Sequence, residues 1–173
     1  MNSKRNKFDK KDSFELGEKA EQIFARIAHK KGWRVSRSLK EGNIHEHWDF
    51  LIKKDEQEFK VDVKALKRLN RRDTHVQDKW LWVELHGVRE HDRGWLYNGK
   101  ADLIAFETNV SFIIVKRTDL IDLVNNLVDS ENMVIHPEEA RYKIYSRNNR
   151  ADKITLIEKE KLKSIKYVEW SKC

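Results

Sequence analysis

The chain has 173 residues, which fits one domain built around a single hydrophobic core. Lysine and arginine number 36 against 29 aspartates and glutamates, and the resulting net charge of +7 favours a polyanionic partner, nucleic acid first. The only cysteine is Cys173, which excludes an intrachain disulfide and a cysteine-based metal site. No apolar run is long enough for a membrane span and no signal peptide precedes the domain, so we expect a cytoplasmic protein.

The N-terminal third begins with a polar, mostly basic stretch. Residues 1–12 are predicted to form a flexible basic arm, and residues 13–173 a single domain. From Ser13, which can cap a helix, apolar residues recur at helical spacing until Gly32. This pattern predicts one amphipathic helix.

The rest of the chain is dominated by short strand patterns. Strands are predicted at 33–38, 45–53, 59–66, 81–88, 94–97, 102–107, 111–116, 142–145 and 154–157. Helices are predicted from a cap at Thr118 to about 128, and near 159–165. This order predicts an α+β fold with a mixed sheet flanked by helices.

The stretch FKVDVKAL, residues 59–66, alternates apolar and charged side chains as a half-buried strand does. If the preceding hairpin turns at Asp55 and Glu56, residues whose numbers sum to 111 pair, and Asp49 faces Asp62. Opposed carboxylates about 5 Å apart destabilise a sheet unless something compensates them, and Mg²⁺ or Mn²⁺ does so well. Lys64 lies on the same face, where its ammonium could orient a water or steady a phosphate.

This arrangement resembles the PD-(D/E)XK nuclease superfamily, of phage and bacterial type. The resemblance rests on Asp49, on Asp62-Val63-Lys64, and on Glu18 in the helix before them, and it covers roughly residues 13–85. It implies a restriction-endonuclease-like core in which Asp49 and Asp62 bind the metal and Lys64 assists the attacking water. Glu18 would supply a further acidic contact.

A basic run follows directly on the acidic strand, so it is expected at the rim of the site. Lys67, Arg68, Arg71 and Arg72 are candidate contacts to the phosphate backbone, and Gln77 is a candidate polar contact. DNA is the expected partner, RNA is not excluded, and a homodimer is possible.

Other interpretations stay open at this point. His45, His47 and Asp49 alternate and could chelate a transition metal, and Glu84 could join the site. The tryptophans near residues 80–95 could stack on bases, although core packing is the more frequent role of such residues.

Taken together, the sequence predicts a metal-dependent nuclease that hydrolyses phosphodiester bonds in DNA. The alternative is a non-catalytic nucleic-acid-binding module that keeps the fold and the basic rim. Two acids facing phosphate favour the first, because a binding module gains nothing from them.

Overall fold

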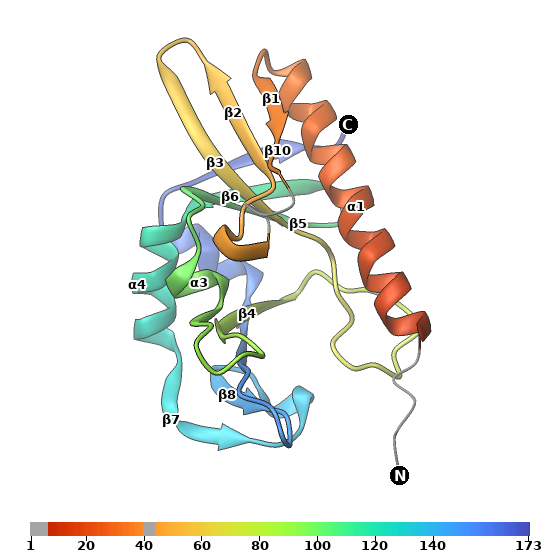
Figure 1. Ribbon diagram of the computed structural model, residues 1–173, viewed down its shortest axis with the longest axis vertical. Helices are drawn as coiled ribbons and strands as arrows, with labels where there is room; N and C mark the ends of the chain where they lie inside the picture. Colours follow the sequence, from red (N-terminus) through yellow and green to blue (C-terminus); the bar gives the residue numbers. More distant parts are fainter. Residues whose placement is uncertain (1–6, 40–43) are drawn as a thin grey trace.

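The computed structural model describes residues 7–39 and 44–173, and it has an α+β architecture with two mixed sheets flanked by helices (Figure 1). The helical elements are α1 (Lys7–Lys30), α3 (Gly94–Asn98), α4 (Arg117–Leu127), and the 3₁₀ turns η1 (Pro137–Glu139) and η2 (Lys159–Ser164). The first sheet is ordered β1 (Arg34–Arg37), β2 (Phe50–Lys54), β3 (Gln57–Lys64), β5 (Leu103–Glu107), β6 (Ser111–Lys116), β10 (Tyr167–Ser171). The second is ordered β4 (Trp80–His86), β9 (Lys153–Glu158), β8 (Lys143–Ser146), β7 (Asp129–Val134).

The register of the β2–β3 hairpin is the one predicted. Phe50 pairs with Val61 and Lys54 with Gln57, which places the turn at 55 and 56. Asp55 has a φ of 53°, in the left-handed region that aspartate tolerates better than most residues. On its other side β3 runs parallel to β5, so the acidic strand is internal to the sheet.

Two apolar cores lie on the two faces of the first sheet. Helix α1 buries an i, i+4, i+7, i+8 stripe, Ala20, Phe24, Ile27 and Ala28, in one core together with Val61 and Val63 of β3. The other core joins α3, α4 and β4 to the opposite face of β5. Residues that alternate along β3 therefore face two different environments.

Helix α1 begins earlier than predicted. It starts at Lys7, so residues 7–12 of the expected arm are helical, while residues 1–6 lie outside the described part. Lys11 pairs with Glu15 one turn on, at 3.7 Å, and Asp12 bonds to Arg68 of the connection after β3. These two pairs connect the N-terminal part of the helix to its next turn and to the connection after β3.

Three further predictions need correction. Residues 44–46 are helical rather than extended, so β2 begins only at Phe50. The stretch 94–97 is helix α3, not a strand: Gly94, with a φ of 71°, turns the chain into a short helix that buries Trp95 and Leu96. Helix α4 begins at Arg117, with Lys116 and not Thr118 at its N-cap.

Strands β7 and β10 and the turn η1 were not predicted. Strand β7 is almost entirely exposed and β10 buries only Trp170, so neither carries the apolar alternation that marks a strand. Strand β10 pairs with β6, which is distant in the sequence, and β7 pairs with β8 in parallel. Within the described residues, no helix is both long and apolar enough to cross a membrane.

Candidate active site

Asp49 and Asp62 meet at the end of the β2–β3 ladder. The Asp49 N–H donates to the Val61 carbonyl at 2.8 Å, which extends the hairpin register by one residue and sets Asp49 opposite Asp62. The Asp49 Oδ2 accepts the Val63 N–H at 2.7 Å, and the two carboxyl groups lie within hydrogen-bonding range of each other. Both residues are buried, with exposed fractions of 7% and 4%. The sequence prediction of an opposed acidic pair on one face is confirmed.

The environment of Asp62 disfavours its charged form. Burial is the main cause that raises its pKa to about 7, the neighbouring Asp49 adds to the effect, and the Lys64 ammonium opposes it. The Lys64 Nζ lies 2.7 Å from the Asp62 Oδ2, but this ion pair is not aligned as a hydrogen bond, and Oδ2 accepts none from the described residues. A carboxylate offers about four lone-pair sites, so Asp62 can accept a cation or a proton in addition to this ion pair.

Lys64 is held by an aromatic ring that the sequence did not assign to the site. Its Nζ lies 4.4 Å from the centre of the Trp95 ring, in cation–π geometry. The Trp95 ring packs edge-on to Phe106, and the Trp95 backbone N–H donates to the Glu84 Oε1 at 3.3 Å. The sequence GWLY was predicted to be a strand. The fold of this stretch as helix α3 is what brings Trp95 to the end of β3.

Two acids of helix α1, the predicted Glu18 and Glu21, differ in their surroundings. Glu18 is exposed, whereas Glu21 is half-buried and its carboxyl pairs with Arg37 at 2.7 Å. Burial raises the pKa of Glu21, and the Asp49 charge is the next largest cause. Glu21 follows the buried Ala20 on the helix, whereas Glu18 lies toward the solvent side, and helical spacing alone did not separate these two acids.

The basic rim lies where the sequence placed it, after β3. Lys67, Arg71 and Arg72 are exposed, while Arg68 bonds to Asp12 of α1. Although Lys67 keeps exposed surface, protein atoms crowd its amine, and this desolvation together with the nearby Lys64 charge lowers its pKa. Lys67 and Lys64 therefore carry like charges close together, which favours an anion between or beside them.

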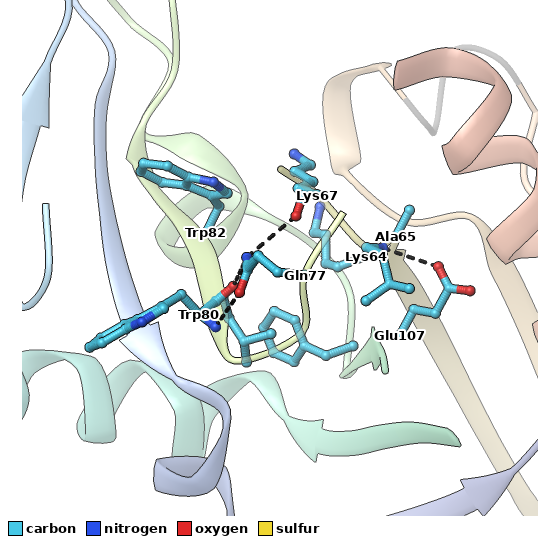
Figure 2. Close-up of a pocket in the computed structure, with 10 residues that line it drawn as sticks. Lys64, Ala65, Lys67, Gln77, Trp80, Trp82 and Glu107 are labelled. Atoms are coloured by element: carbon cyan, nitrogen blue, oxygen red, sulfur yellow. Dashed lines mark hydrogen bonds between the residues drawn. The ribbon is translucent and has the colours of Figure 1, made fainter. Parts of the chain in front are cut away.

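Gln77 has a structural role in this arrangement. Its amide donates to the carbonyls of Lys67 and Trp80, at 3.3 and 2.8 Å, and its Oε1 accepts the Trp80 N–H at 2.7 Å. Figure 2 shows Gln77 bridging the two segments, with the Trp80 ring directed away from Lys64 and Lys67. The side chain closes the connection between β3 and β4, and these bonds occupy its amide.

The histidines do not form the transition-metal set that was left open. His45 is exposed on the helical turn, and His47 lies 3.7 Å from Asp92. Within the described residues no group of three or more His, Cys, Asp or Glu side chains is arranged as a metal site. Glu84 lies near the site, because it contacts Trp95 and its charge acts on Lys67.

A comparison with solved structures finds a protein similar to this chain, whereas two comparisons of sequence find none. No family model matches the chain, and no curated protein matches it. The solved structure of a bacterial homing endonuclease is similar to it, with a TM-score of 0.46, 17% sequence identity, and coverage of 62% of this chain and 70% of that chain. At these values the similarity does not itself assign an activity.

Proposed function

We propose that this protein is a nuclease of the PD-(D/E)XK type that hydrolyses phosphodiester bonds in DNA with a divalent cation, Mg²⁺ or Mn²⁺. The observation that carries the proposal is the buried Asp49–Asp62 pair with the Lys64 ammonium 2.7 Å from Asp62. The order of helix, acidic strand and D-x-K strand, which resembles that of these nucleases, supports the same activity.

The two carboxyl groups fit a hard divalent cation. Mg²⁺ prefers carboxylate oxygens and is held in proteins by one or two of them, with water and substrate phosphate completing its shell. Asp49 and Asp62 supply such a pair, since both are buried and lie opposite each other. Asp49 and Asp62 would hold the cation. Its positive charge would favour the ionised form of Asp62 and so lower the pKa that burial raises.

The residues of the site would then have separate roles. The bound cation would lower the pKa of a water molecule and neutralise charge on the phosphate. The Val63 N–H fixes the orientation of the Asp49 carboxyl group. Lys64, placed between Asp62 and the Trp95 ring, would orient the attacking water or stabilise the charge that develops on phosphate oxygen. Arg71 and Arg72 would hold the DNA backbone.

The test separates cleavage from binding. Unmodified protein is expected to nick supercoiled DNA with Mg²⁺ and not with EDTA, whereas Asp62→Asn should abolish nicking. The same variant should bind duplex DNA without metal at least as tightly as unmodified protein, because it removes one negative charge facing phosphate. The matched control is Asp122→Asn, which removes an exposed carboxylate on α4 and should retain nicking.

Two results would contradict the proposal. Full activity of a folded Asp62→Asn variant would rule out the assigned site. Absence of cleavage of any DNA or RNA form by unmodified protein that nevertheless binds DNA would favour the non-catalytic binding module. Circular dichroism of each variant establishes that the fold is intact.

A further inference from the structure

The second sheet carries a basic hairpin that approaches the candidate active site. The hairpin joins β8 to β9 and comprises residues 147–152, with the sequence RNNRAD. Its turn is closed by the Arg150 N–H, which donates to the Arg147 carbonyl at 3.2 Å. Asn148 and Asn149 are exposed at its tip.

Contacts across the second sheet connect this hairpin to the basic rim. Tyr145, at the end of β8, packs on Trp82 of β4 with ring centres 6.3 Å apart, and the Trp82 indole N–H donates to the Arg68 carbonyl at 3.0 Å. Independently, the charge of Arg147 acts on Lys67, whose amine lies beside Lys64. Strand β8 is therefore connected through Trp82 to the segment that follows the D-x-K strand, although about 80 residues separate them in sequence.

Arg147 is fixed in place rather than mobile. Its guanidinium donates twice to Asp152, which is completely buried, and the Arg147 side chain remains 27% exposed. This pair joins the two arms of the hairpin just beyond the last paired residues, Ser146 and Lys153. A guanidinium held by a buried carboxylate keeps donors for a phosphate with little loss of side-chain entropy on binding.

We propose that residues 147–150 form a second contact to the phosphate backbone of bound DNA, outside the scissile phosphate. The duplex would lie along Lys67, Arg71 and Arg72 and continue onto the hairpin. This inference rests on the proposed function, because it assigns the second sheet to the same DNA. Acidic side chains near this path include Glu84, which bonds to Trp95, and Asp152, which bonds to Arg147. They also include Asp12, which bonds to Arg68, and Glu107, which accepts the Leu66 N–H. The exposed acid Asp73 lies on the rim segment itself.

The experiment changes charge at the exposed hairpin tip, where folding is not at risk. Asn148→Glu should weaken binding of a DNA duplex about fivefold, and Asn148→Lys should tighten it by a similar factor, as expected for one charge near one phosphate. Asn148→Lys should also steepen the dependence of log affinity on log salt by up to about 0.9. Binding is measured by fluorescence anisotropy with EDTA, so that cleavage does not interfere.

The matched controls are Gln57→Glu and Gln57→Lys. Gln57 is exposed at the β2–β3 hairpin, which lies at the opposite end of the molecule from β8 in Figure 1. These variants change net charge identically and should leave affinity close to that of unmodified protein. Equal effects at positions 57 and 148 would overturn the inference, because they would show a response to overall charge alone.

The outcomes also separate this inference from the proposed function. If unmodified protein nicks DNA but both Asn148 variants bind like it, the hairpin contact is wrong and the nuclease assignment stands. If unmodified protein neither binds nor cleaves duplex DNA, both are wrong. Effects of Asn148 substitution seen with duplex RNA and not with duplex DNA would overturn the choice of DNA.

Discussion

Asn in place of Asp62 is expected to stabilise the metal-free protein, and more so as pH rises. Burial raises the pKa of Asp62 from its ordinary value of 3.8 to about 7. Below pH 3.8 the carboxyl group is protonated in both the folded and the unfolded chain. Between the two values the unfolded chain releases the proton and the folded chain retains it, so the free energy of unfolding falls as pH rises through this window.

The size of the effect follows from the same values. Each tenfold change in proton affinity corresponds to about 1.4 kcal/mol, so ionising Asp62 in the folded state costs up to about 4 kcal/mol at a pH above 7. Between about pH 5 and about pH 8, the difference in unfolding free energy between Asp62→Asn and unmodified protein should widen by about 3 kcal/mol. Comparing two pH values cancels constant effects of the substitution, such as an altered hydrogen bond.

Urea denaturation of both proteins in EDTA measures this difference, with Asp122→Asn as the control for an exposed carboxylate. Adding Mn²⁺ at about pH 8 should then stabilise unmodified protein and not Asp62→Asn, because ligand binding to the folded state alone shifts the equilibrium. Parallel pH dependence of the two proteins would refute the reasoning. It would show that Asp62 is not held in an environment that resists its charge.

Three more predictions address the parts of the site separately. Trp95→Leu should lower the cleavage rate about 2- to 30-fold, as expected for a cation–π contact worth about 0.5 to 2 kcal/mol, and Trp95→Phe should recover part of it, measured across pH. Glu21→Gln should reduce cleavage with Mg²⁺ whereas Glu18→Gln should not, since the charge of Asp49 acts on Glu21 and Glu18 is exposed; equal loss in both would contradict this. Replacing both Arg71 and Arg72 by Ala should lower the magnitude of the salt slope of DNA binding by up to about two, and cleavage at saturating protein should largely survive.

The β2–β3 hairpin and its acidic pair were predictable because local rules determine them. Polar residues at 54–58 set the turn, and the period-two pattern of 59–66 sets the buried face. Together they determine the register, and the register places Asp49 opposite Asp62. No long-range contact was needed for this step.

The remaining parts of the site depend on contacts distant in sequence. Trp95 reaches Lys64 from a helix about 30 residues later, and its sequence context suggested a strand. Gly94 permits that helix start, because it has a φ of 71° and an added Cβ would lie 2.8 Å from the Glu84 carbonyl oxygen. The distinction between Glu21 and Glu18 depends on how α1 is rotated on the sheet, which the neighbouring Arg37 and Asp49 reveal only in three dimensions.

The apolar face of β3 explains how the fold tolerates the buried Asp49–Asp62 pair, which lowers the stability of the protein. Val61 and Val63, on either side of Asp62, have exposed fractions of 0% and 8% and pack with α1. A slip of one residue would move both valines out of that core and Asp62 into it. Burying these two valine side chains contributes roughly 1.5 to 3 kcal/mol each, and this gain opposes the cost of ionising Asp62. Helix α1 thus supports the candidate site from the opposite face of the sheet, because its packing on Val61 and Val63 stabilises the register that the hairpin sets.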